Sequence, residues 1–414
     1  MTAEFGPETA ELLRQQIQDQ FCIEGALFNG GPLIPPEAEE TLLPQFTALI
    51  TGMNSEDLPP EQRDRILQAL EAARDWTRGF WEQKTDISGK VISKCIFQDI
   101  SLAAWDMRGA VFDSCVFRNA VLPGHLVDVV FQQCSLEQCS LDHAGDAPPR
   151  LENVRIDTCT LRDADFSGVA TEVFSCTASD LRKVSFRGMR RIRKSGFSGC
   201  VFEDVCLEES FLNNMYFEDI VSASGLSFAG SSMQGAVISG LSLSPGSGNL
   251  LKGCDLTCAN FTAPVFADSA ALEGAVLNRT VLTGGTFSGL TFRRQDLSCV
   301  WMNTCHLISC IFEECRLENA KFAGSTLEDT LVQNCLGEQI FAEESTFSRC
   351  VFRGSVLDRS IFSRATMTEC ILDGCSLRQA RRHGTVTADC QMKDLDETGI
   401  MDTDIPLWDA EHFY

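Results

Sequence analysis

The chain has 414 residues, of which 44% are hydrophobic and 22% charged, and its formal net charge is -24. This composition is typical of globular proteins and excludes disorder over the whole chain. The excess of acids argues against generic nucleic-acid binding, because that binding depends on Lys and Arg displacing counterions.

The first 88 residues predict an α-helical N-terminal domain. Residues 7–21 and 36–53 are expected to form short helices, and residues 59–83 a longer one that Asp57 can cap. The apolar face of the longer helix contains Ile66, Leu70, Ala73, Trp76 and Phe80. No basic segment followed by an apolar one marks a signal peptide, and no stretch approaches the roughly 18 apolar residues of a membrane helix. We expect residues 1–88 either to cap the following fold or to recognise a partner.

Between residues 95 and 377 an apolar residue occupies every fifth position in long blocks. The longest block contains Leu277, Leu282, Phe287, Phe292, Leu297, Met302, Leu307, Phe312, Leu317, Phe322, Leu327 and Val332. Two residues before each of these centres the residue is most often small, as at Ala110 and Cys310. Inward positions are thus spaced two, three, two, three, which neither a straight strand nor an α-helix produces. A turn must absorb the extra residue of every repeat, so we expect coils that stack about 4.8 Å apart.

This pattern resembles the pentapeptide repeat family, whose motif is written A-(D/N)-L-x-x. The closest matches are Ala164-Asp165-Phe166 and Ala259-Asn260-Phe261. The resemblance implies a mainly β fold, a right-handed quadrilateral β-helix with four repeats and about 20 residues per coil. Residues 89–392 would form this solenoid, with about 14 coils at the spacing of stacked strands.

The cysteines have a structural interpretation. The chain has 20 of them, and fourteen occupy the small inward position, where a free cysteine is a compact hydrophobe. Pairs twenty residues apart, such as Cys95/Cys115 and Cys350/Cys370, should stack one coil apart with parallel thiols. We therefore expect buried thiols in a reducing compartment, with disulfides as the less favoured alternative. The His residues are scattered and no Cys-x-x-Cys pair occurs, so neither a metal site nor a cofactor is expected.

The repeat is interrupted at four places. The register slips between Pro123 and Val130, residues 142–149 predict a loop, and residues 217–256 are rich in Ser and Gly, with an everted loop expected near Pro245. A further slip follows Phe186 and carries the strongest basic cluster. Its members are Arg182, Lys183, Arg187, Arg190, Arg191, Arg193 and Lys194. This cluster is either a solvated loop that offsets nearby acids or a docking patch for an acidic partner.

Residues 393–414 form an acidic tail with aromatic side chains. Apolar aromatic groups at a terminus are costly when exposed. Trp408, Phe413 and Tyr414 are therefore expected either to fold back as a C-terminal cap or to dock onto another subunit or a partner.

No catalytic motif is present, so we expect no enzyme and assign no catalytic residue. The family resemblance implies two functions. One is a scaffold or adaptor, as in accessory proteins of bacterial type VI secretion that help load effectors. The other is mimicry of DNA, as in relatives that protect DNA gyrase. A duplex carries one charge per ~1.7 Å, so a rod of ~67 Å would need about 40 negative charges. After residue 90 the chain has 42 acids and 27 bases, a net charge of -15.

The scaffold is therefore the favoured hypothesis. We expect a bacterial cytoplasmic protein with a protein partner, without direct binding to nucleic acid or membrane. Secretion would need a route independent of a signal peptide, and oligomers could form through either end.

Overall fold

The computed structural model describes residues 27–28, 31–32, 85–143, 147–191, 193–243, 250–267 and 271–403. These residues contain no α-helix, and no helix among them could cross a membrane. The helices predicted before residue 84 lie outside the described residues, as do Trp408, Phe413 and Tyr414. Asp86 bridges Asp106 in the next coil, and Ile87 is buried.

Most repeats bend at a residue with positive φ. On four successive corners these residues are Ser309 (φ 53°), Glu314 (φ 54°), Asn319 (φ 59°) and Gly324 (φ 66°). Each lies two residues after a buried centre, so this residue is the turn that the two-three spacing predicts. The left-handed conformation costs an L-residue about 1–2 kcal/mol. Packing and hydrogen bonding between coils must offset that cost at every corner.

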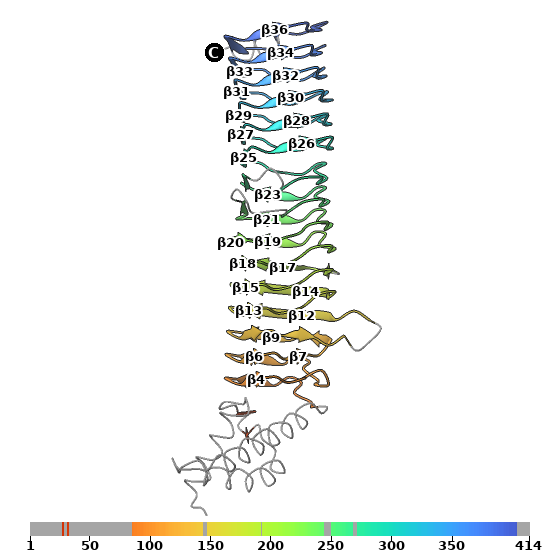
Figure 1. The fold of residues 1–414 in the computed structure, drawn as a ribbon, viewed down its shortest axis with the longest axis vertical. Helices are drawn as coiled ribbons and strands as arrows, with labels where there is room; N and C mark the ends of the chain where they lie inside the picture. The colour runs from red at the N-terminus through yellow and green to blue at the C-terminus, as the bar shows by residue number, and fades with distance from the viewer. Residues whose placement is uncertain are drawn as a thin grey trace, which may run out of the picture. The chain divides into compact units, whose positions relative to one another are not determined.

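The chain divides into two compact units, Met1–Val184 and Ser185–Tyr414, which together hold about 14 coils. The described strands of the first unit are β1 Leu27–Phe28, β2 Gly31–Pro32, β3 Val91–Ser93, β4 Ile96–Gln98, β5 Val111–Asp113, β6 Val116–Arg118, β7 Val121–Leu122, β8 His125–Val127, β9 Val130–Gln132, β10 Ser135–Glu137, β11 Ser140–Leu141, β12 Arg150–Asp157, β13 Thr160–Arg162, β14 Ala170–Thr177 and β15 Asp180–Arg182. Apart from the antiparallel pair β1–β2, their pairings are parallel, between successive coils (Figure 1).

The interruptions predicted in the first unit change the length of single coils. Phe112 pairs with Phe131, nineteen positions on, so the slip after Pro123 removes one residue. Leu126 pairs with Leu151, twenty-five positions on, so one extra repeat-length segment leaves the coil at the predicted 142–149 loop. Residues 144–146 of that loop lie outside the described residues. Both slips therefore keep the coils in register on either side.

The second unit continues the same architecture. Its described strands are β16 Arg190–Arg191, β17 Ser195–Ser198, β18 Val201–Glu203, β19 Tyr216–Glu218, β20 Ser222–Ser224, β21 Val237–Ser239, β22 Ser242–Leu243, β23 Asn260–Thr262, β24 Val265–Phe266, β25 Thr286–Ser288, β26 Thr291–Arg293, β27 His306–Ile308, β28 Ile311–Glu313, β29 Thr326–Glu328, β30 Leu331–Gln333, β31 Thr346–Ser348, β32 Val351–Arg353, β33 Thr366–Thr368, β34 Ile371–Asp373, β35 Val386–Ala388 and β36 Gln391–Lys393.

Coil length varies in the Ser/Gly-rich part of this unit and then becomes constant. Phe217 pairs with Ile238 after twenty-one residues, and Ile238 with Phe261 after twenty-three. The coils thus continue through residues 217–256, as predicted, while the loop expected at Pro245 lies outside the described residues. From Phe287 to Leu307 and onward, every step is twenty residues.

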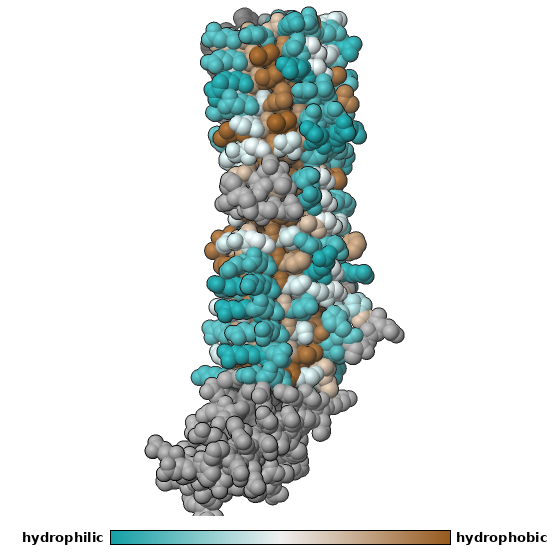
Figure 2. Space-filling model, in the orientation of Figure 1, coloured by the Kyte–Doolittle hydropathy of each residue, from teal (hydrophilic) through white to brown (hydrophobic). Residues whose placement is uncertain are grey.

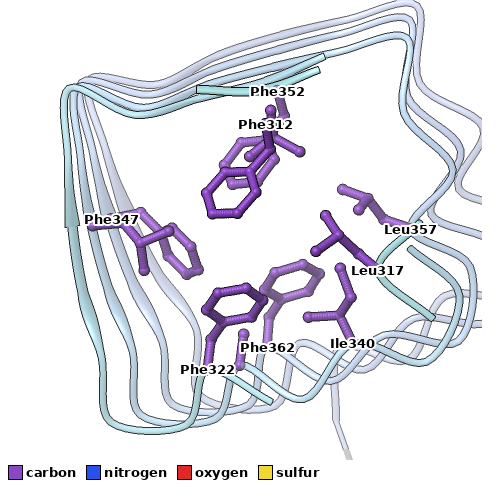
Figure 3. Close-up of a pocket in the computed structure, with 11 residues that line it drawn as sticks. Phe312, Leu317, Phe322, Ile340, Phe347, Phe352, Leu357 and Phe362 are labelled. Atoms are coloured by element: carbon purple, nitrogen blue, oxygen red, sulfur yellow. The ribbon is translucent and has the colours of Figure 1, made fainter. Parts of the chain in front are cut away.

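The interior of the coils is a column of the predicted centres. All twelve centres from Leu277 to Val332 are buried. Figure 3 views part of this column, where Phe312 and Phe352, Phe347, Phe322 and Phe362, and Leu317 and Leu357 enter from the four sides of the coil. The four-sided cross-section expected from the resemblance is therefore confirmed.

Candidate protein-interaction surfaces

The slip after Phe186 places a charged side chain at a position that is apolar elsewhere. Phe186 and Phe197 are buried centres eleven residues apart, so one of the two intervening steps is six residues long. Arg191 occupies the position of the missing centre. Its backbone N–H donates a hydrogen bond to the backbone carbonyl of Phe211 at 2.8 Å. Its Nε is buried without a hydrogen-bond partner, and desolvation lowers the pKa of the guanidinium. An arginine at this position is costly for folding.

The predicted basic cluster is divided by its ion pairs. Arg182 lies in the first unit and contacts Asp180 at 2.9 Å. Arg187, in the second unit, contacts Glu208 at 3.4 Å and Glu209 more closely, and the hydrogen bond to Glu209 raises the arginine pKa. Neighbouring acids thus offset the charges of Arg182 and Arg187, as the interpretation of the cluster as a solvated loop expects.

Other members of the cluster are exposed. Lys183 belongs to the first unit, whereas Arg190, Arg193 and Lys194 belong to the second. Within the described part of the chain, Lys183, Arg190 and Lys194 have no ion-pair partner. The structure thus brings Arg190, Arg193 and Lys194 together on one short segment of the second unit, and it describes Arg182 and Lys183 only in the first.

An exposed aromatic side chain lies next to this segment. Phe211 is 57% exposed, and its backbone bridges that of Arg190 in the adjacent coil. One step further, Gly196 lies under Tyr216: a Cβ added to Gly196 would come 2.4 Å from the ring. We call Arg190, Arg193, Lys194 and Phe211 the slip surface. The sequence analysis missed Phe211 because it lies one coil, or twenty-one residues, after Arg190 in the chain.

A second surface was not predicted. Outward residues at twenty-residue intervals bridge one another along the later coils, and we call this set the aromatic ladder. It consists of Val281, Trp301, Lys321, Phe341 and Ile361. The Lys321 Nζ lies 3.8 Å from the centroid of the Trp301 ring and 5.9 Å from that of Phe341. The signal in the sequence was an aromatic or long side chain directly before an inward centre, repeated at a spacing of twenty.

Most arginines elsewhere on the second unit pair with an acid one coil away. Examples are Arg293–Glu313 at 2.7 Å, Arg294–Glu314 at 2.6 Å, Arg349–Asp329 at 2.7 Å, Arg364–Glu344 at 2.8 Å and Arg378–Asp358 at 3.0 Å. Acids and bases therefore interleave along the coils. Figure 2 shows the hydrophilic side chains in columns beside a narrow apolar stripe.

The described residues contain no group of three His, Cys, Asp or Glu side chains that could hold a metal ion. One cavity lies inside the later coils, has a volume of about 30 Å³ and is lined by apolar side chains (Figure 3). An apolar interior cavity offers no polar group for chemistry. The two surfaces above are the candidate interaction surfaces that we consider further.

Comparison with known proteins agrees with the repeat. Residues 345–381 match the family model of the pentapeptide repeats, in eight copies. These residues are pentapeptide repeats. The pattern that defines them continues in the same register back to Leu277. None of the curated proteins matches the chain.

Several solved structures resemble the chain at low identity. HetL, a pentapeptide repeat protein involved in heterocyst differentiation regulation from Nostoc sp. strain PCC 7120, is 16% identical over 61% of this chain and 89% of its own, with a TM-score of 0.23. QnrB1, a plasmid-mediated fluoroquinolone resistance protein, is 16% identical over 46% and 82%, with a TM-score of 0.24. The A-module of the mannuronan C-5 epimerase AlgE6 from Azotobacter vinelandii is 12% identical over 78% and 95%, with a TM-score of 0.20. At these TM-scores the similarities do not bear on function.

Proposed function

We propose that the chain is a non-catalytic protein-interaction scaffold of the bacterial cytoplasm, which docks an acidic partner protein on the slip surface. The pentapeptide-repeat coils provide a rigid support, and the interruption of the repeat provides the binding residues. The observation that carries this proposal is the contrast in ion pairing. Arg190 and Lys194 have no acidic partner among the described residues, whereas most arginines of the later coils, such as Arg293, Arg294 and Arg349, pair with an acid of an adjacent coil.

The aromatic side chain strengthens the proposal. Aromatic residues and arginine are enriched among the residues that contribute most to protein–protein binding. Phe211 is an exposed aromatic residue, and its backbone bridges that of Arg190 in the adjacent coil. A partner that placed a carboxylate on Arg190 and an apolar side chain on Phe211 would satisfy both residues at once.

Affinity purification of the tagged full chain from its native cell tests this function. We expect a stoichiometric partner that is lost, by about tenfold or more, from a variant with Arg190→Glu and Lys194→Glu, because reversed charges repel an acidic surface. Arg162→Glu is the matched control, since Arg162 is an exposed arginine of the regular coils without an ion pair in the described residues. Retention of the partner by the slip variant would disprove docking at this surface.

A narrower form of the proposal is an accessory protein that loads effectors in a type VI-like secretion system. The support for it is the family resemblance alone. Genes for secretion components beside the gene of this chain would favour this narrower proposal. Absence of secretion proteins from the partners recovered by affinity purification would count against it.

DNA mimicry is the competing function, and the interleaved charges weigh against it. A mimic needs acids in long unbroken rows, as in a phosphate backbone. In the ion pairs Arg293–Glu313 and Arg353–Asp373, the latter at 3.7 Å, the sign of the charge instead alternates from one coil to the next. A DNA gyrase supercoiling assay decides between the two: inhibition or protection by micromolar full chain would favour mimicry over the scaffold.

A further inference from the structure

At Phe341, the aromatic ladder places an apolar side chain on the surface of a coil whose core is under-filled. Trp301 is 42% exposed. In the coil of Phe341, the inward centres are Gly337 and Ala342, and the cavity of about 30 Å³ lies there. Leu336, directly before Gly337, points outward and is 51% exposed. Stability alone would favour large apolar groups inside and polar groups outside. The outward aromatic and aliphatic residues therefore call for a binding role.

The charge of the ladder identifies the kind of occupant. The Lys321 ammonium lies between two aromatic rings and has no acidic partner in the described residues, unlike the neighbouring arginines. A segment that carries carboxylates among apolar and aromatic side chains would complement this surface, since it could pair with the amine and cover the rings.

The chain itself contains such a segment directly after the described residues. Met401 bridges Arg381, which bridges Ile361, so the last described coil ends on the same row as the ladder. The chain then continues with residues 404–414, Asp-Ile-Pro-Leu-Trp-Asp-Ala-Glu-His-Phe-Tyr. Five coil steps from Met401 back to Trp301 cover about 24 Å, and eleven extended residues reach about 36 Å. The segment is long enough to reach Trp301.

We propose that residues 404–414 bind along the aromatic ladder of the same chain. Their carboxylates face Lys321, and their aromatic side chains cover Trp301, Phe341 and Ile361. The proposal does not depend on the slip surface.

The open end of the solenoid is the competing place for the same segment, and most of its inward centres are polar. Its last coil has Thr387, Met392, Glu397 and Asp402 at the inward centres. Arg382, at the centre below, contacts Asp402 at 2.8 Å and Glu397 at 2.9 Å. Three of these four centres are polar, so charged side chains already close much of the interior. The ladder instead offers the aromatic residues the rings of Trp301 and Phe341 beside the Lys321 ammonium.

Photo-crosslinking in the full chain tests the proposal. Trp408 is replaced by benzoylphenylalanine, and the crosslinked peptides are identified by mass spectrometry. We expect crosslinks to peptides that contain Trp301, Lys321 or Phe341. Lys321→Glu should reduce their yield by about tenfold, because it places like charges together. Arg162→Glu is again the matched control and should leave the yield unchanged, and circular dichroism checks that both variants keep the fold.

Four outcomes would overturn the proposal. Crosslinks to residues 386–401 would place the segment on the open end. Crosslinks formed only between isotopically distinct copies, in a mixture of labelled and unlabelled chain, would assign the ladder to a second molecule. Absence of any crosslink to the ladder would leave it without this occupant. A yield that Lys321→Glu does not change would remove the electrostatic basis of the binding.

Discussion

The small inward residue of each repeat makes hydrogen bonds in addition to packing. Ser325 Oγ accepts the N–H of Cys305, one coil below, at 3.0 Å and donates to Met302 O at 2.6 Å. Cys305 Sγ donates in the same way to Leu282 O at 3.1 Å. Cysteine and serine are therefore alternatives at this position because both satisfy buried backbone groups at the corners.

Substitution of Ser325 tests this role. Ser325→Ala should leave the Cys305 N–H unsatisfied and lower the free energy of unfolding by about 1–3 kcal/mol. Ser325→Cys should keep most of the stability, because a thiol occupies the equivalent position in many coils. The measurement is urea denaturation, with Thr326→Ala on the outward side as the control. Equal stability of Ser325→Ala and the wild type would show that the site has a packing role alone.

The free thiols predicted from the sequence are largely confirmed. All described cysteines are free, and of the fourteen assigned to inward positions all but Cys390 are buried. The stacking of Cys350 and Cys370 one coil apart is also confirmed, since Val351 and Ile371, which directly follow them, pair between adjacent strands. A hydrogen bond to Cys370 raises the pKa of Cys350. Cys335 belongs to the same class and was missed, because its repeat centre is Gly337 rather than a large apolar residue.

Burial of these thiols makes stability depend on pH in the alkaline range. Desolvation raises the pKa of Cys305 and of Cys310 from 9.0 to about 11. Their contribution to stability is fully present below pH 9 and is lost as the pH rises through about 11, because the unfolded chain ionises first. The loss should approach about 1.4 kcal/mol per pH unit for each thiol. A Cys305→Ser, Cys310→Ser variant should therefore lose less stability between pH 9 and pH 11 in urea denaturation. Parallel curves for the two proteins would contradict this account.

At the scale of the element, one coil exchanges the usual sizes of its residues. Gly337 and Ala342 replace large centres, while Ile340 occupies a position that is small elsewhere. A Cβ on Gly337 would lie 2.6 Å from Ile340 Cδ1, so the isoleucine fills the space that a leucine would take. The compensation is incomplete, which explains the cavity beside Phe322 and Phe362.

Filling the cavity should stabilise the protein. Ala342→Val adds two methyl groups on the cavity side and should raise the free energy of unfolding by about 1 kcal/mol. Ala320→Val is the matched control, since Ala320 is fully buried at a small position away from the cavity, and it should destabilise by about 1–3 kcal/mol. Both are measured by urea denaturation. A destabilised Ala342→Val would mean that the cavity cannot accept the added volume.

The extent to which sequence predicted these elements follows from the physics of each. The period of five predicted the coils, their inward centres and the turn in every repeat, because all three are local consequences of spacing. Interruptions were located, but their lengths were not, since pairing partners such as Phe112 and Phe131 are set by the neighbouring coil. Of the candidate site, Arg190 and Lys194 came from sequence, whereas Phe211 and the aromatic ladder required the coil length. The separation of paired from unpaired arginines required coordinates.

At the scale of the whole molecule, each coil of the second unit depends on its neighbours. Backbone hydrogen bonds join β27 to β25 and β29, whereas β35 pairs with β33 on one side among the described strands. In a solenoid, stability is approximately a sum of coil terms and interface terms, so a terminal coil with one interface opens most readily. Ion pairs across this interface gain importance where apolar centres are absent.

We therefore predict a gradient of hydrogen exchange along the second unit. Amides of β35 and β36 should exchange about a hundredfold faster than those of β27 and β28, because local opening of an end coil costs less than opening of an interior one. Asp402→Asn should increase this difference. The Arg382 side chain is only 23% exposed, and the substitution removes the negative charge of Asp402 that it contacts. Glu369→Gln, at an exposed acid, is the control. Exchange measured by mass spectrometry at equal rates in all coils would show that the second unit opens as one cooperative body, and no effect of Asp402→Asn would show that the Arg382 contacts do not hold the last coil.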